Sequence, residues 1–331
     1  MYLTKSPMRV TFIGGGTDHK SFFDLNEGAT ISSAINKFVY VITNEQPMFV
    51  NDKFRFTYRK TESVSKAEDF EHPVVRETLR YFEWVQPLNI STMADLPGSS
   101  GLGSSSAFTA ALYQNLSKRL RKKIDAEALA KEVIHLERDL LGEPGGYQDQ
   151  VITTHGGLRL ITYNQSNFVP SNDFLDKEFT EYCRNRLLLV RTKSIKSSMK
   201  SAAANEKYIR ASLQNIELTK LSEKTKEIWA TFVSNKTSSD KFNTLQKAIQ
   251  TSWAGKKKWG EHIFTKEISH TLTLLINAGV SHFKLVGSGG GGFVLVAEEP
   301  EVLKNLNNVF ESQDLVNFQL SSTNTKTTYY E

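Results

Sequence analysis

LPGSSGLGSSSA, residues 96–107, is the stretch that most constrains the fold of this chain. Its three glycines and five serines stand directly before residues 104–120, where apolar side chains recur at helical spacing. Glycines let a backbone approach a ligand closely, and a helix N-terminus offers unpaired N–H groups and the positive end of the helix dipole. We therefore predict an anion-binding loop, with phosphate as the anion, in preference to a flexible linker.

The loop is not of the P-loop type, because it lacks the Gly-Lys-Ser/Thr ending of that motif. A second glycine cluster, KLVGSGGGGF at residues 284–293, contains a GxGxxG pattern. A dinucleotide site would need a helix to begin there, whereas residues 293–297 (FVLVA) predict a strand. We interpret this cluster as a turn between two strands that packs against another loop or a nucleotide, with a purely structural hairpin as the alternative.

Two carboxylates could serve phosphoryl transfer. Glu137 lies at the edge of the apolar stripe of a helix predicted over residues 126–141, and Asp149 lies in the glycine-led loop GGYQDQ. Phosphoryl transfer needs a magnesium ligand and a group that orients or deprotonates the attacking hydroxyl, and two carboxylates can divide these roles. Spacing alone leaves open that Glu137 is a solvated partner of Arg138 or Lys131.

The N-terminal GGGTD, residues 14–18, follows a short buried strand predicted over residues 8–13. Its glycines would let a polar ligand reach the backbone, and Asp18 could accept hydrogen bonds from sugar hydroxyls. An ordinary turn is the alternative. The histidines have no metal-binding spacing, and no GxSxG elbow suggests a hydrolase.

Composition excludes several classes of protein. The 331 residues suggest about two domains, and the net charge of +5 is too dispersed for a nucleic-acid partner. The densest basic runs, Lys118–Lys123 and Lys256–Lys258, are interpreted as solvated helix faces. Cys183 is the only cysteine, so an intrachain disulfide is excluded. The chain has no apolar run of membrane-spanning length and no signal peptide, so we expect a cytoplasmic protein without a membrane partner.

The order of predicted elements favours an α+β fold over a regular βαβ alternation. Strands are predicted at residues 30–43, 49–58, 88–94, 157–163 and 187–192, helices at 73–84, 104–120 and 126–141, a largely helical region at 198–278, and two late strands at 283–286 and 293–297. The polar stretch 164–185 is the expected place of a domain boundary.

Together the three glycine motifs resemble those of the GHMP kinases, which include galactokinase and the homoserine, mevalonate and phosphomevalonate kinases. The resemblance runs from Pro7 to Phe293: SPMRVTFIGGGTD, PGSSGLGSSSA and KLVGSGGGGF occur in the family's order. The GGGTD form, GGYQDQ and SWAGKK (residues 252–257) are similar to the D-glycero-D-manno-heptose 7-phosphate kinase branch. That branch phosphorylates the anomeric hydroxyl of a heptose phosphate for capsule or lipopolysaccharide precursors.

The resemblance implies a GHMP kinase fold with two domains and the active site between them. Residues 1–180 would form an ATP-binding domain like ribosomal protein S5 domain 2, and residues 181–331 a ferredoxin-like domain. The expected reaction converts ATP and a sugar phosphate, with Mg²⁺, into ADP and a sugar 1,n-bisphosphate.

The resemblance also assigns roles to individual residues. Asp149 would be catalytic, and Glu137 would bind magnesium together with Ser105. The ATP phosphates would be held by Gly98, Ser99, Gly101, Gly103, Ser104, Ser105 and Ser106. The sugar would be held by Arg9, Gly15, Gly16, Thr17 and Asp18, with Gly289 and Gly290 on the substrate side and Gly287 supporting the phosphate loop.

This sequence departs from the heptose kinase branch at one position, where the branch is expected to contact the distal phosphate, which is the phosphate that the sugar already carries. Heptose kinases tend to carry an arginine where this chain has Thr192-Lys-Ser-Ile-Lys196. Lysine supplies charge but not a bidentate fork. Lys193 and Lys196 are therefore candidate phosphate contacts, with surface lysines as the alternative.

Two other functions stay open: an anomeric kinase for an unphosphorylated sugar such as L-fucose or galactose, and a non-catalytic sensor of ATP and sugar. A homodimer is also left open.

Overall fold

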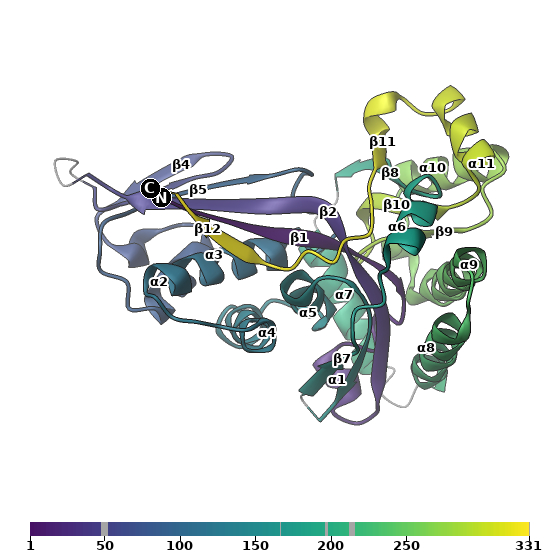
Figure 1. Ribbon diagram of the computed structural model, residues 1–331, viewed down its shortest axis with the longest axis horizontal. Helices are drawn as coiled ribbons and strands as arrows, with labels where there is room; N and C mark the ends of the chain where they lie inside the picture. Colours follow the sequence, from purple (N-terminus) through teal and green to yellow (C-terminus); the bar gives the residue numbers. More distant parts are fainter. Residues whose placement is uncertain (48–51, 166, 196–197, 212–215, 331) are drawn as a thin grey trace.

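The computed structural model describes residues 1–47, 52–165, 167–195, 198–211 and 216–330 (Figure 1). Its larger sheet has the strand order β12-β1-β2-β5-β3-β4, with β6 and β7 joined to it through β2, and a smaller sheet has the order β11-β8-β10-β9. The strands of the larger sheet are β1 (Tyr2–Ile13), β2 (Gly28–Glu45), β3 (Phe54–Thr57), β4 (Thr61–Val64), β5 (Leu88–Ala94), β6 (Leu158–Asn164), β7 (Asn167–Pro170) and β12 (Lys326–Tyr329).

β1 and β2 form a long antiparallel pair at the centre of the larger sheet. Met8, Val10 and Phe12 on β1 are fully buried. The register between the two strands shifts between Pro7 and Arg9. Such irregularities re-aim side chains, and here Arg9 is buried at the edge of a cleft.

Helices cover one face of the larger sheet, below it in Figure 1. They are α2 (Pro73–Tyr81), α3 (Ser104–Arg119), α4 (Ala126–Ile134) and α5 (Gln148–His155), and α3 and α5 pack directly on β1 and β2. The helix predicted over residues 126–141 exists but changes character, because α4 gives way to a π-helical turn at His135–Leu140. Glu137 lies in this turn, and π-helical turns are frequent at functional sites.

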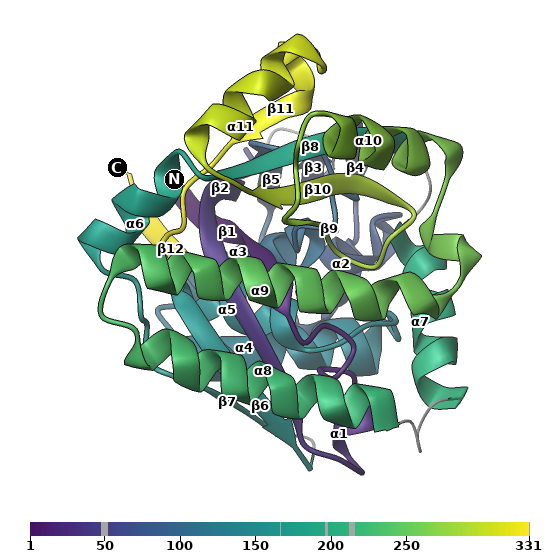
Figure 2. The same ribbon diagram turned by 90° about the vertical axis from the view of Figure 1, so that its right-hand side faces the viewer.

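The remaining strands form the smaller sheet: β8 (Leu187–Ile195), β9 (Phe283–Leu285), β10 (Gly291–Ala297) and β11 (Leu315–Asn317). The two late strands are thus confirmed as an antiparallel pair joined by a glycine-rich turn. Figure 2 shows α8 (Ile216–Ser234) and α9 (Ser238–Lys256) running side by side beneath this sheet. The other helices are α1 (Lys20–Phe23), α6 (Lys177–Arg184), α7 (Ser198–Ala211), α10 (Lys266–Asn277) and α11 (Pro300–Asn305).

The predicted domain boundary near residue 180 falls within α6, shortly before the first strand of the smaller sheet. The last strand, β12, returns to the larger sheet and pairs with β1. Both ends of the described chain therefore meet at one sheet edge, where the Met1 amino group donates to the Tyr330 carbonyl at 2.8 Å. In the described part of the chain no helix combines the length and apolar character needed to cross a membrane.

Candidate active site

A cavity of about 920 Å³ is lined by residues from both sheets and from the helices between them. Arg9 enters it from β1, Lys284 from β9 and Lys256 from the end of α9. Segments far apart in the sequence therefore converge on one cleft, which is large enough to hold two small-molecule substrates.

The glycine- and serine-rich loop forms one wall of this cavity. All seven residues predicted to hold ATP phosphates line it: Gly98, Ser99, Gly101, Gly103, Ser104, Ser105 and Ser106. Gly103 is the N-cap of α3, with φ of 73°, a conformation that favours glycine. The first N–H groups of α3 are thus presented at the cavity, as an anion-binding helix N-terminus requires.

The second glycine cluster supports the phosphate loop from the other sheet. A Cβ on Gly287 would lie 2.5 Å from the Gly101 Cα, and one on Gly292 would lie 2.3 Å from the Ser100 carbonyl oxygen. Only glycine allows backbones to pack this closely. Gly289 instead packs on Ile263, and neither it nor Gly290 is among the described residues that line the cavity. Their predicted contact with substrate therefore gains no support from the geometry and stays a prediction.

Gly287→Ala is expected to lower the free energy of unfolding by about 1–3 kcal/mol and to raise the KM for ATP, because φ at this position is +63° and the methyl group would strike Gly101. Thermal denaturation and ATP kinetics measure the two effects. Gly255→Ala is the matched control, since nothing lies within 4 Å of a Cβ there. Equal behaviour of the two variants would contradict the close-packing role.

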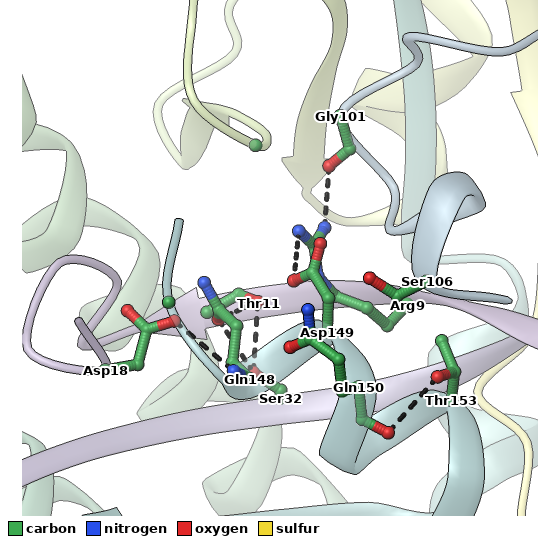
Figure 3. Close-up of polar contacts among 12 residues, drawn as sticks. Arg9, Thr11, Asp18, Ser32, Gly101, Ser106, Gln148, Asp149, Gln150 and Thr153 are labelled. Carbon is green, nitrogen blue, oxygen red and sulfur yellow. Dashed lines mark hydrogen bonds and ion pairs between the residues drawn. The ribbon is translucent and has the colours of Figure 1, made fainter. Parts of the chain in front are cut away.

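Arg9 ties the predicted catalytic aspartate to the phosphate loop (Figure 3). Its Nε donates to the Asp149 carboxylate at 2.7 Å and its Nη2 lies 2.6 Å from the same oxygen, while Nη1 donates to the Gly101 carbonyl at 2.6 Å. Asp149 is the second residue of α5, and its Oδ2 lies beside Gly103. The carboxylate is therefore fixed next to the N-terminus of α3, where an acceptor and a phosphate could meet.

Glu137 is buried rather than solvated, with only 1% of its surface exposed. Its carboxylate accepts hydrogen bonds from Ser106 Oγ at 2.9 Å, Thr109 Oγ1 at 2.8 Å and Gln150 Nε2 at 2.5 Å. Arg138 lies 3.7 Å away. Glu137 lines the cavity, so the alternative of a surface carboxylate does not describe it.

Glu137 and Ser105 are predicted to hold magnesium together; both line the cavity, and this pairing stays a prediction. The loop hydroxyl that contacts the carboxylate is that of Ser106, whereas Ser105 is exposed to the cavity. No group of three or more acidic, histidine or cysteine ligands exists in the described ranges. Magnesium held by nucleotide phosphates needs only one or two protein oxygens, so a cavity-facing Glu137 beside serine hydroxyls fits this ion.

The GGGTD segment contributes to the cavity through Gly15, Gly16 and Asp18. Asp18 Oδ1 accepts from the Gly16 N–H at 2.8 Å. Its Oδ2 accepts from the Gln148 N–H at 3.3 Å (Figure 3). Thr17 is fully buried and does not line the cavity: its hydroxyl oxygen lies 2.8 Å from the Gly14 carbonyl oxygen in the turn and 2.9 Å from the Ala29 carbonyl oxygen on β2. The geometry thus gives Thr17 a structural role and lends no support to its predicted sugar contact.

The structure does not bring Lys193 to the cavity. Its ammonium lies 2.9 Å from Asp314 and 3.2 Å from Glu311, and it is not among the described lining residues. Lys196 lies outside the described residues. The two candidate contacts for a distal phosphate thus gain no support from the geometry.

Two buried lysines belong to the site and were not singled out from the sequence. Lys256, interpreted as part of a solvated run, is buried and lines the cavity, whereas Lys257 and Lys258 are exposed. Burial, reinforced by the charge of Arg9, lowers the pKa of Lys256 to about 7. Burial also lowers the pKa of Lys284 well below its usual value, with Lys256 and Arg9 adding to the effect.

A signal for Lys256 was present in the sequence. Leu245, Ile249, Trp253 and Lys256 recur at spacings of three and four, so they share one face of α9, and all four are buried.

An aromatic cluster forms part of the cavity lining. Phe56, Tyr58, His72 and Phe108 all line it, with Phe56 stacked on Tyr58 at 4.7 Å between ring centroids. Burial lowers the pKa of His72, and its Nδ1 has no hydrogen-bond partner in the described part of the chain. Flat aromatic walls with a free polar atom suit a nucleobase.

A glycine- and serine-rich loop at a helix N-terminus, beside an Arg-bound aspartate and a buried glutamate, is the arrangement expected of a small-molecule kinase. Residues 70–157 match the family model described as GHMP kinases N terminal domain. The chain is thus a sugar kinase, a phosphotransferase with an alcohol group as acceptor, that carries a GHMP kinase N-terminal domain, and the expected α+β GHMP kinase fold is confirmed. Kinases of this family use ATP as the phosphate donor.

Similar proteins span nearly the whole chain. D-glycero-alpha-D-manno-heptose 7-phosphate kinase of Campylobacter jejuni is 26% identical over 92% of this chain and 91% of its own length. The bifunctional fucokinase/GDP-fucose pyrophosphorylase of Arabidopsis thaliana is 24% identical over 91% of this chain, which matches 30% of that longer protein. The crystal structure of a D-glycero-D-manno-heptose 1-phosphate kinase from Bacteroides thetaiotaomicron superposes with a TM-score of 0.71 at 18% identity, covering 100% of both chains.

Proposed function

We propose that this kinase transfers the γ-phosphoryl group of ATP to the anomeric hydroxyl of D-glycero-D-manno-heptose 7-phosphate, giving the 1,7-bisphosphate for capsule or lipopolysaccharide synthesis. The heptose 7-phosphate kinase that matches nine-tenths of the chain supports this acceptor. The observation that carries the transfer is the Arg9–Asp149 pair, which is anchored to the phosphate loop through the Gly101 carbonyl.

In the proposed arrangement the nucleobase lies against the aromatic cluster of Phe56, Tyr58, His72 and Phe108, and the phosphates lie at the N-terminus of α3. Asp149 orients the acceptor hydroxyl or accepts its proton. The acceptor oxygen then bonds to the γ-phosphorus as the bond from that phosphorus to the β–γ bridging oxygen breaks, and ADP leaves. Arg9 holds the carboxylate in position throughout.

Glu137 and the serine hydroxyls of the loop would hold magnesium. The ion neutralises charge on the phosphates when it is bound. The hydrogen bonds from Ser106, Thr109 and Gln150 fix the orientation of the Glu137 carboxylate before any ligand arrives. Gly15, Gly16 and Asp18 would contact the sugar from the opposite side of the cleft.

A panel of acceptors tests the substrate. ADP release should be fastest with heptose 7-phosphate, and its kcat/KM should exceed that of the unphosphorylated heptose at least about tenfold, the worth of one charge-assisted contact. Galactose and L-fucose serve as comparison sugars in the same assay. Equal or faster turnover of an unphosphorylated sugar would overturn the proposed acceptor.

An unphosphorylated acceptor is the second candidate, and one observation favours it. Lys193, expected to meet the distal phosphate, is engaged by Glu311 and Asp314 away from the cavity. The similarity to the Arabidopsis fucokinase points the same way. The acceptor panel separates the two candidates directly.

A further inference from the structure

Lys256 is the last residue of α9, at the point where that helix reaches the cleft. The two lysines that follow it are exposed, so this short basic run divides into one buried and two solvated side chains. A buried lysine that lines a cavity needs partners for its ammonium group.

The hydrogen bonds of Lys256 leave one donor unused. Its Nζ donates to the carbonyls of Leu285 and Gly287, at the start of the glycine-rich turn. A protonated lysine has three N–H donors, whereas a neutral one has two. Among the described residues these two carbonyls satisfy neutral Lys256 completely and leave protonated Lys256 with one N–H unpaired.

Lys284 is a natural comparison, because it is equally buried but fully bonded. Its Nζ donates to Thr11 O at 2.9 Å, Phe12 O at 3.3 Å and Ser252 Oγ at 2.9 Å. All three N–H groups of protonated Lys284 therefore have protein partners. Of the two buried lysines, Lys256 is the one with bonding capacity left for a ligand.

The charges around Lys256 favour an anion. Arg9 from β1 acts on it electrostatically, and Lys284 from β9 interacts with both. Asp149 on α5 pairs with Arg9, but no ion pair joins either lysine to a carboxylate in the described part of the chain. The excess positive charge lies beside the phosphate loop, because Gly287, which accepts from Lys256, packs on Gly101.

We propose that Lys256 binds a phosphoryl group in the cleft and takes up a proton as that group enters. The proposal rests on the proposed kinase function and adds a residue to it. A phosphoryl oxygen would accept the third N–H, and its negative charge would favour the ammonium form. The proton comes from solvent and remains on Nζ while the phosphoryl group is bound.

The direction of the pH effect follows from the pKa of about 7 in the empty site. Above that pH the free side chain is mostly neutral, so binding must add a proton. Below it the side chain is already protonated, so binding adds little. Proton uptake on binding should therefore be large at pH 8 and small at pH 6.

Titration calorimetry with Mg²⁺ and the β,γ-imido analogue of ATP, in two buffers of different ionisation enthalpy, measures this uptake. We expect about 0.5–1 proton at pH 8 and a much smaller value at pH 6. Lys256→Met should abolish the difference and weaken binding about ten- to a hundredfold, while the exposed-site control Lys257→Met behaves as the parent. The pH dependence of the parent remains informative should Lys256→Met fold poorly.

Titrations with different ligands identify which phosphoryl group Lys256 binds. Uptake with the ATP analogue but not with ADP assigns Lys256 to the γ-phosphoryl group, and uptake with heptose 7-phosphate but not heptose assigns it to the acceptor phosphate. Equal uptake by the parent and Lys256→Met, or no uptake at pH 8 with tightly bound ligands, would overturn the proposal while leaving the kinase function intact. Failure of the nucleotide to bind at all would instead remove the proposed function and this role with it.

Discussion

Asp149→Asn is expected to lower kcat by about two to four orders of magnitude while ATP and sugar bind almost as in the parent. The asparagine keeps the size of the side chain, but it can neither accept the hydroxyl proton nor form an ion pair with Arg9. Calorimetry measures the binding of ATP and sugar, and a turnover assay measures kcat, so the effects on binding and on catalysis are separated.

Asp24→Asn is the matched control, because Asp24 pairs with Lys20 on the surface and is not a described lining residue of the cleft. This control should turn over like the parent. If Asp149→Asn also turned over within a few-fold of the parent, Asp149 would not be the catalytic residue.

Glu137→Gln is expected to raise the magnesium concentration needed for half-maximal rate and to lower kcat about a hundredfold or more. The amide keeps the shape but removes the charge that would face the ion. In the parent, Ser106, Thr109 and Gln150 all donate hydrogen bonds to the Glu137 carboxylate. The NH₂ group of the new glutamine would face these donors and could not accept their hydrogen bonds. Magnesium titrations of the rate provide the measurement, with thermal denaturation to monitor folding.

Glu127→Gln supplies the comparison for this variant, since Glu127 is an exposed residue of α4 that pairs with Lys131. Its magnesium dependence should equal that of the parent. A parental magnesium dependence in Glu137→Gln would show that Glu137 orders the loop without holding the ion.

The phosphate loop could be predicted because its signals are local. Glycine and serine composition, followed at once by helical spacing, specifies an anion-binding helix N-terminus without knowledge of distant contacts. All seven predicted loop residues consequently line the cavity. The hydrogen bond from Ser106 to Glu137 was not predicted, because neighbouring helical residues point about 100° apart and spacing alone does not say which serine faces that carboxylate.

Residues whose environment depends on tertiary packing were harder to predict. Lys193 meets Asp314, more than a hundred residues away, and Lys256 is buried only because α9 packs beneath the glycine-rich turn. The aromatic cluster of the cavity combines Phe56 from β3, His72 from the position before α2, and Phe108 from α3. A basic or aromatic side chain carries no local mark of such partners. The division into domains near residue 180 and the catalytic and binding roles of the site residues stay predictions.

Phosphorus NMR of the reaction mixture tests the central claim most directly. With ATP and heptose 7-phosphate, the account predicts a new phosphate ester whose phosphorus couples to the anomeric proton, formed in step with ADP, while the original phosphate ester remains unchanged. ADP accompanied only by inorganic phosphate, or an ester on any other oxygen of the sugar, would contradict transfer to the anomeric hydroxyl.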